Sequence, residues 1–191
     1  MYTWILGTLG FGLCFLYDCN SIRWHHRLLH YSFGLGFGLI GTATALELAQ
    51  AIGAGAIGTF MDWVWLALAA LSLAALIYCL FFALPFSDTY QAPEAGRSVC
   101  RQGVYALCRH PGWFPFFFTY MFLGLAALPG QLLYLGLLLS FWNLLYIWFQ
   151  DRVSFPRTFC DYQDYRACVP FLIPTKDSMR QAIRTGKKDS L

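Results

Sequence analysis

Five apolar segments alternate with shorter polar ones along this chain of 191 residues. They cover residues 2–17, 31–48, 61–84, 113–128 and 131–149. A helix of about 20 apolar residues crosses the hydrocarbon core of a bilayer, and the longer segments reach that length. The pattern therefore predicts an all-α polytopic membrane bundle with about five transmembrane helices.

The connections between the segments refine this picture. Residues 49–60 are small and apolar, which suits either a loop or an extension of a neighbouring span. Glu47 and Asp62 flank this stretch, and we expect both at span ends in water. Pro129-Gly130 is a tight-turn signal, so the last two spans should form an antiparallel hairpin. The hairpin would bring residues 109–113 close to residues 150–152 at one membrane face.

The chain becomes polar from Gln150 onward, and its aromatic residues there recur at spacings of three and four. Phe155, Phe159, Tyr162 and Tyr165 follow this spacing, which predicts an amphipathic helical segment. It would lie on the membrane or against the bundle, where it would also suit a cover over a cofactor. We divide the chain into a three-span region 1–84, a hairpin region 85–175 and a basic tail 176–191.

Composition and charge place the bundle in a membrane and give its orientation. Hydrophobic residues make up 58% of the chain and charged residues 12%, whereas soluble domains carry about 25% charge. All 13 lysines and arginines fall within residues 18–30, 85–112 and 150–191. Basic residues favour the cytoplasmic side, so this distribution predicts an outer N-terminus and a cytoplasmic C-terminus. We expect the basic tail to be a frayed end attracted to anionic lipid and not a nucleic-acid arm.

Two groups of polar and aromatic residues stand at the ends of the predicted hairpin. The first group is Gly103-Val104-Tyr105 followed by Arg109-His110-Pro111-Gly112-Trp113. The second group is Gln150-Asp151, Tyr162-Gln163-Asp164-Tyr165 and Val169-Pro170-Phe171-Leu172-Ile173-Pro174. In order and spacing these groups resemble the superfamily of isoprenylcysteine carboxyl methyltransferases and phospholipid methyltransferases. The resemblance covers about residues 85–175. Differences lie at Gln150 within the usual acidic pair, at Trp113 in place of tyrosine, and at Pro115 in place of glycine.

The resemblance implies a cytoplasm-facing pocket for S-adenosylmethionine and a lipophilic acceptor that enters from the bilayer. The residues at its cofactor positions are Tyr105, Arg109, His110, Pro111, Trp113, Gln150, Asp151 and Tyr162. Of these, we expect Arg109, His110 and Asp151 to take part in catalysis. A sulfonium cation favours aromatic faces, the carboxylate of the cofactor favours Arg109, and its ribose hydroxyls and amino group favour Asp151. His110 would donate to the cofactor or accept a proton from the acceptor.

Each residue also has a structural interpretation when it is taken alone. Arg109 suits a snorkelling arginine that fixes topology, and His110-Pro111 suits the entry of a helix. Trp113 suits an interfacial aromatic belt, and Asp151 a solvated helix end. Only the joint pattern favours a site.

Three functions stay open at this stage. The leading one is methyl transfer from S-adenosylmethionine to a hydrophobic small molecule or lipid. The second is a non-catalytic relative, a membrane scaffold or lipid-binding protein, which the differences at Pro115 and Gln150 favour. A membrane reductase is the third, and cofactor competition would separate it. His26 and His30 lie one helical turn apart without an evident third ligand, so we expect no metal. The sequence leaves the acceptor and the oligomeric state open.

Overall fold

The computed structural model describes residues 2–83 and 98–186, and these residues form an all-helical structure. The elements are α1 (Tyr2–Cys19), η1 (Asn20–Trp24), η2 (Leu28–Tyr31), α2 (Ser32–Gly53), α3 (Phe60–Ile77), η3 (Tyr78–Phe82), α5 (Val104–Leu107), α6 (Trp113–Ala126), α7 (Gln131–Phe149), η4 (Gln150–Ser154), α8 (Phe155–Thr158), α9 (Tyr162–Cys168) and α10 (Lys176–Gly186). The boundary predicted near residue 84 and the last five residues of the predicted tail lie outside the described residues.

An apolar helix occupies each of the five predicted positions. Four continuous helical stretches are long and apolar enough to cross a membrane, and they cover Tyr2–Trp24, Leu28–Gly53, Phe60–Phe82 and Gln131–Thr158. The remaining helix, α6, has 14 residues and therefore extends about 21 Å, less than the roughly 30 Å of a hydrocarbon core. The described residues are thus consistent with a multi-pass membrane protein that has at least four spans.

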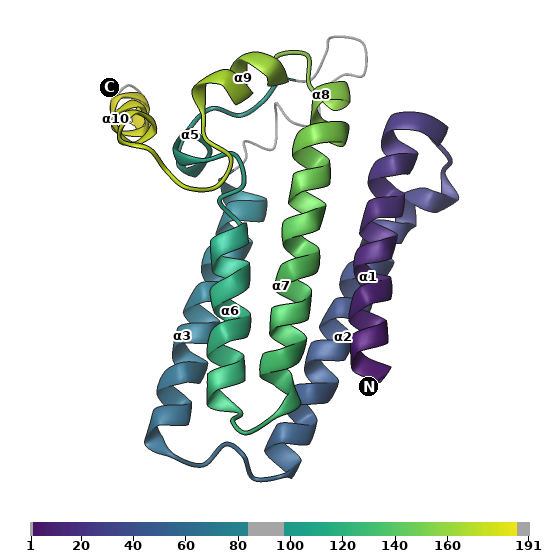
Figure 1. Ribbon diagram of the computed structural model, residues 1–191, viewed down its shortest axis with the longest axis vertical. Helices are drawn as coiled ribbons and strands as arrows, with labels where there is room; N and C mark the ends of the chain where they lie inside the picture. The colour runs from purple at the N-terminus through teal and green to yellow at the C-terminus, as the bar shows by residue number, and fades with distance from the viewer. Residues whose placement is uncertain (1, 84–97, 187–191) are drawn as a thin grey trace.

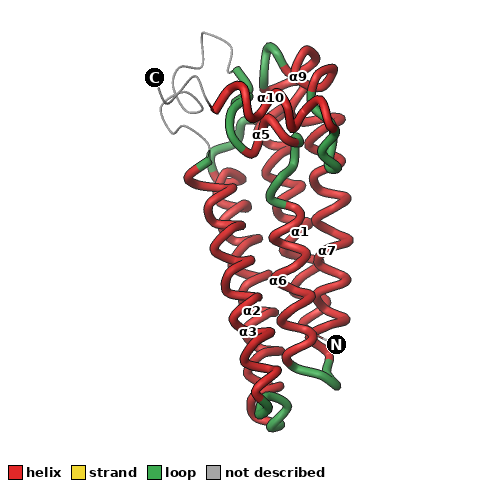
Figure 2. The backbone as a smooth tube through the Cα atoms, turned by 90° about the vertical axis from the view of Figure 1, so that its left-hand side faces the viewer, coloured by secondary structure: helices red, strands yellow, loops and turns green. Residues whose placement is uncertain are grey.

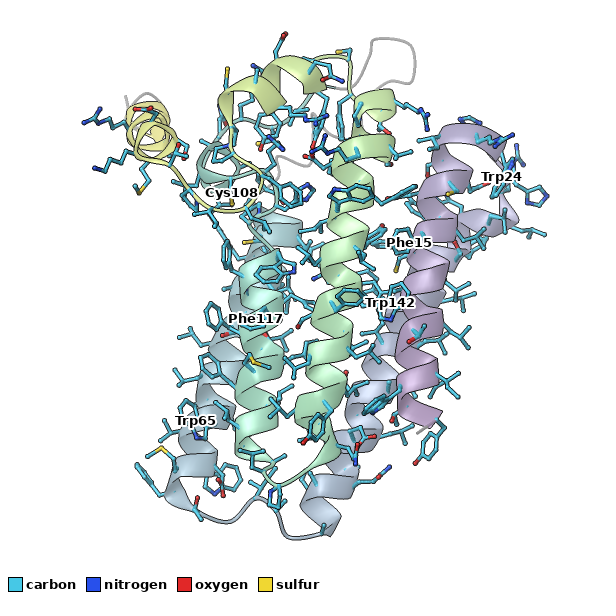
Figure 3. The ribbon with its side chains drawn as sticks, in the orientation of Figure 1. Phe15, Trp24, Trp65, Cys108, Phe117 and Trp142 are labelled. Atoms are coloured by element: carbon cyan, nitrogen blue, oxygen red, sulfur yellow. The ribbon has the colours of Figure 1, made fainter. Side chains whose placement is uncertain are left out.

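The five long helices pack side by side as one bundle (Figure 1). Its core includes Phe11, Ile40, Tyr120, Leu135 and Leu139, which come from α1, α2, α6 and α7. Trp142 points from α7 toward α1 (Figure 3), and its indole Nε1 donates a hydrogen bond to Thr8 Oγ1 at 3.2 Å. These contacts hold the hairpin of α6 and α7 against the first two helices.

Glycines bring neighbouring helices unusually close at two crossings. A Cβ atom on Gly10 of α1 would lie 2.7 Å from the carbonyl oxygen of Gly36 in α2. A Cβ atom on Gly124 of α6 would lie 2.7 Å from Leu133 Cα in α7. The second contact lies next to the Pro129-Gly130 turn and confirms the predicted antiparallel hairpin. Close backbone approach of this kind favours helix association in lipid, because dispersion contacts replace the hydrophobic effect there.

The stretch 49–60 is divided between a helix and a loop. Residues 49–53 extend α2, and Thr59 caps α3 by accepting a hydrogen bond from the Asp62 backbone N–H at 3.3 Å. Asp62 accepts from the Thr59 backbone N–H at 2.8 Å, which completes a capping box. The expectation that Glu47 lies in water is wrong, because Glu47 is buried and accepts a hydrogen bond from Thr3 Oγ1 at 2.5 Å.

Short helices cover the end of the bundle opposite to the N-terminus. Figure 2 shows α5, α9 and α10 gathered there. The helical segment expected after Gln150 is divided into short helices, since Phe159 is extended between α8 and α9. The described part of the tail expected to be frayed, residues 176–186, forms α10 instead. Its start is fixed by reciprocal bonds in which the backbone N–H groups of Thr175 and Ser178 donate to each other's hydroxyl oxygens.

Candidate functional site

Two segments far apart in sequence pair through their backbones at the covered end of the bundle. Gly103 has φ of 57°, a left-handed conformation that favours glycine, and it begins the short helix α5. After α5 the chain becomes extended at Cys108. The backbone N–H of Arg109 then donates to the Pro170 carbonyl at 2.9 Å, and that of His110 donates to the Phe171 carbonyl at 3.3 Å. This pairing aims the Arg109 and His110 side chains at the end of α7.

Arg109 and Asp151 form a buried bidentate ion pair. Arg109 Nε donates to Asp151 Oδ1 at 2.7 Å, and Nη2 donates to Oδ2 at 3.2 Å. The side chains of Arg109 and Asp151 are 8% and 2% exposed to solvent. Arg109 Nη1 donates to the carbonyls of Val169 at 2.6 Å and Arg166 at 3.0 Å. The guanidinium therefore joins η4 to the last turn of α9 and to Val169 directly after it.

Other polar side chains converge on the same carboxylate. Tyr162 Oη donates to Asp151 Oδ1 at 2.6 Å, and Arg166 Nε lies 3.9 Å from Oδ2. Burial, with the hydrogen bond to the carboxylate, holds the pKa of Tyr162 well above its ordinary value, so the phenol stays a neutral donor. Asp151 thus accepts from an arginine and a tyrosine, as a buried carboxylate requires.

His110 lies beside this pair, with one ring nitrogen only loosely paired with Asp151. Its ring stacks on Phe155 at 5.7 Å between centroids and meets Phe171 edge-on at 5.1 Å. His110 Nε2 is 3.6 Å from Asp151 Oδ1 and has no hydrogen-bond partner among the described residues. Burial lowers the pKa of His110 below its ordinary value despite the nearby carboxylate, so the ring is neutral near pH 7. This buried nitrogen is only loosely paired with Asp151, so it is a place where a polar group of a ligand can bond.

An aromatic cavity of about 120 Å³ adjoins the ion pair. Its lining includes Arg109 and the aromatic residues Tyr105, Phe155, Phe159, Tyr162 and Tyr165. Two of the phenols are held in place by hydrogen bonds, since Tyr105 Oη donates to the Cys79 carbonyl at 2.9 Å and Tyr165 Oη donates to the Tyr105 carbonyl at 2.7 Å. Burial raises the pKa of both phenols, so both are neutral, and aromatic residues with Arg109 make up most of the described lining.

Partly buried contacts of Asp161 hold the segment that carries Val99, a residue of the cavity lining. Asp161 Oδ1 accepts from the Val99 backbone N–H at 2.9 Å, and Asp161 Oδ2 accepts from Arg101 Nη2 at 2.9 Å. Asp161 directly precedes α9, so these contacts join the start of the described segment 98–103 to the helix that carries Tyr162 and Tyr165.

The structure brings most of the predicted site residues together. Tyr105, Arg109, His110, Asp151 and Tyr162 meet in one cluster, as the predicted hairpin requires. Pro111 begins the turn into α6. Trp113 opens that helix and stacks on Phe117 at 5.3 Å, with its Nε1 buried and unpaired among the described residues.

Gln150 does not join the cluster. Its side chain interacts with the Asp18 carboxylate on α1. Adjacent helical residues point about 100° apart, so Gln150 cannot share the direction of Asp151. Pro115 lies in the first turn of α6, where a backbone N–H has no intrahelical partner, and α6 continues past it to Ala126.

Sequence reasoning missed several residues of the site. Phe155 is expected from the sequence only as part of an amphipathic face, and Tyr165 and Phe171 belong to the second motif group without an assigned role at the site. The Val169 and Arg166 carbonyls that accept from Arg109 carry no side-chain signal at all. The motif Val169–Pro174 was the available clue, because an ordered segment with two prolines near a buried cluster indicates a structural contact.

Comparisons of the chain with protein-family models, with curated proteins and with solved structures find no match.

Proposed function

We propose that the apolar helices form a membrane bundle of five spans with the N-terminus outside and the C-terminus in the cytoplasm. The distribution of basic residues supports this orientation, since the described arginines gather at the end of the bundle that carries α5, α9 and α10 (Figure 3). In this arrangement α6 is a short span that packs between α3 and α7. The cluster around Asp151 then lies at the cytoplasmic membrane face.

We further propose that this cluster serves methyl transfer from S-adenosylmethionine to a lipophilic acceptor. One observation carries the proposal: the two motif halves, separated by more than 40 residues, meet as the Arg109–Asp151 pair beside an aromatic cavity. When bound, the cofactor supplies an activated methyl group, so the protein needs little acid–base chemistry. Positioning of the two reactants contributes about 7–11 kcal/mol in favourable cases.

The geometry revises the roles expected for two residues. Arg109 and Asp151 already bind each other, so in this proposal they position the cavity wall and do not hold the carboxylate or ribose of the cofactor. The aromatic faces of Tyr105, Phe155 and Tyr162 suit a sulfonium cation at about 0.5–2 kcal/mol each. Neutral His110 offers its loosely paired Nε2 to a polar group of either reactant.

The size of the cavity sets a requirement. Ligand pockets usually measure about 300–1,000 Å³, and this cavity measures about 120 Å³. It admits one end of a nucleoside-sized cofactor, so binding of the whole molecule requires aromatic side chains such as Phe155 and Phe159 to change rotamer.

The experiment is calorimetry of the purified full chain in detergent with S-adenosylmethionine. We expect saturable binding by the wild type and a clear loss of affinity in His110→Ala, while His30→Ala, an exposed histidine outside the cluster, binds like the wild type. Thermal melting of each variant checks that it is folded. Absence of saturable wild-type binding, or equal binding by His110→Ala, would reject the proposal.

A second candidate is a non-catalytic membrane scaffold or lipid-binding protein. The observation that favours it is that Arg109 and Asp151 already form hydrogen bonds with each other and that the adjoining cavity is small. Transfer of a radiolabelled methyl group from S-adenosylmethionine into extracted membrane lipids would decide against it. Cofactor binding without any transfer to lipids or to small hydrophobic acceptors would decide for it.

A further inference from the structure

A larger groove lies on the other side of the same helical turn, between α1–η1 and α7–η4–α8. Its volume is about 410 Å³. Arg23 of η1 and Arg157 of α8 line it, together with the apolar side chains of Ile22, Trp24, Phe149 and Val153. Trp24 stands at the η1 turn (Figure 3).

The groove is separate from the cluster around Asp151. Val153 and Arg157 follow Asp151 and Phe155 by two residues each, and residues two apart lie on roughly opposite sides of a π-helix or an α-helix. Asp151 faces Arg109 and Phe155 lines the aromatic cavity, whereas Val153 and Arg157 line the groove beside α1. The lining residues of the groove and of the aromatic cavity do not overlap.

Charge in the groove is positive and unbalanced. Neither Arg23 nor Arg157 forms a side-chain hydrogen bond or ion pair with another described residue, and none of the described lining residues is acidic. Both arginines are exposed. Two guanidinium groups on different elements, facing one groove, suit an anion with several acceptor oxygens such as a phosphate.

The apolar walls and the position of the groove indicate what the anionic group is attached to. Cys19–Trp24 end the first candidate span, and Phe149–Arg157 end the last one, so the groove lies at the height of lipid headgroups in the proposed membrane placement. Arginines at span ends commonly snorkel to the interface, but snorkelling needs no hollow. Here the arginines border a groove with four apolar residues, which suits an anionic head joined to a hydrocarbon chain.

We infer that this groove binds an anionic glycerophospholipid, with the phosphate between Arg23 and Arg157 and the upper acyl chain against Phe149 and Val153. The inference rests on the membrane placement of the bundle and is independent of methyl transfer. It assigns a lipid site to the α1–α8 groove, apart from the acceptor that the methyl-transfer proposal requires.

The test is native mass spectrometry of the delipidated full chain in detergent, titrated with phosphatidylglycerol or with phosphatidylcholine. We expect preferential retention of one phosphatidylglycerol by the wild type. The double variant Arg23→Gln with Arg157→Gln should bind it about thirty-fold more weakly, from the contribution of two arginines near an anionic lipid. Arg27→Gln with Arg180→Gln, a matched loss of two exposed charges outside the groove, should bind it like the wild type.

Four results would overturn the inference. They are equal binding by the groove variant, equal loss in the matched control, equal retention of phosphatidylcholine, and displacement of the lipid by millimolar inorganic phosphate. The third result would show that the headgroup charge is not selected, and the fourth that the groove holds a free anion. A thermal melt confirms that both double variants are folded. Failure of S-adenosylmethionine binding would leave this result unchanged, so the two proposals fail separately.

Discussion

The buried pair of Arg109 and Asp151 offers the sharpest test of how the covered end of the bundle is held together. Asp151→Asn keeps the shape of the side chain and removes its charge, which leaves the Arg109 guanidinium buried without a counter-ion. Removing one partner of a buried pair costs about 3–5 kcal/mol. Exposures of 8% and 2% for the two side chains place this pair in the buried class, where solvent screening is weak.

The double variant Arg109→Met with Asp151→Leu distinguishes the cost of losing the ion pair from the cost of leaving one charge buried without a partner. If the single variants Arg109→Met and Asp151→Leu each cost about 3–5 kcal/mol, additivity predicts about 6–10 kcal/mol for the double variant. Replacement of both charges strands neither, so we expect the double variant to lose about 3–5 kcal/mol. That residual loss comes from the Val169 and Arg166 carbonyls, which lose their donor, and from Tyr162, which loses its acceptor.

The assay is equilibrium unfolding of the purified chain by SDS in mixed micelles, followed by tryptophan fluorescence. Asp177→Asn is the matched control, because that carboxylate lies on α10 with 94% of its side chain exposed, and its loss should leave the transition unchanged. A loss below about 1 kcal/mol for Asp151→Asn, or strict additivity of the single and double variants, would refute the reasoning.

Two further predictions follow from burial and packing. His110 is buried and its pKa is lowered, so below about pH 6.5 this histidine binds a proton more readily in the unfolded chain than in the folded chain. The contribution of neutral His110 to the free energy of unfolding is therefore fully present above about pH 6.5 and is lost as the pH falls. The thermal midpoint of the wild type should therefore fall more than that of His110→Gln between about pH 7.5 and about pH 5, and parallel curves would contradict this. Gly10→Ala should destabilise the α1–α2 crossing by about 1–3 kcal/mol, because its Cβ would meet Gly36 O at 2.7 Å. Gly12→Ala on the same helix meets nothing within 4 Å and should be neutral or stabilising in the same SDS titration.

Much of the bundle could be predicted because membrane helices carry their signal in local composition. The five apolar segments lie at the helices α1, α2, α3, α6 and α7, and Pro129-Gly130 marks the hairpin turn correctly. The hairpin in turn predicts that residues near Arg109 meet residues near Asp151, which the 2.7 Å hydrogen bond confirms. Long-range geometry followed here from one local turn.

Predictions failed where the partner of a residue lies far away in the sequence. Glu47 reads as a charged span end, but its partner Thr3 lies 44 residues earlier on a helix that only the folded bundle brings close. The sequence predicts that Arg109 and Asp151 lie close together. It does not predict that they form a bidentate ion pair, because the spacing of residues does not show which acceptors a guanidinium binds. The break at Phe159 likewise depends on tertiary packing, since Phe155, Phe159, Tyr162 and Tyr165 reach one cluster across two short helices.

One turn at the end of the last long helix connects the surfaces discussed above. Within Gln150–Ser154 and the adjoining α8, Gln150 faces Asp18, Asp151 faces Arg109, and Val153 with Arg157 faces the groove. A substitution that unwinds η4 would disturb all three contacts together and could not assign an effect to any of them. Changes at side-chain tips, such as Arg157→Gln, leave the helix register intact. Loss of lipid binding with unchanged S-adenosylmethionine binding in that variant would therefore locate the effect in the groove and not in the turn.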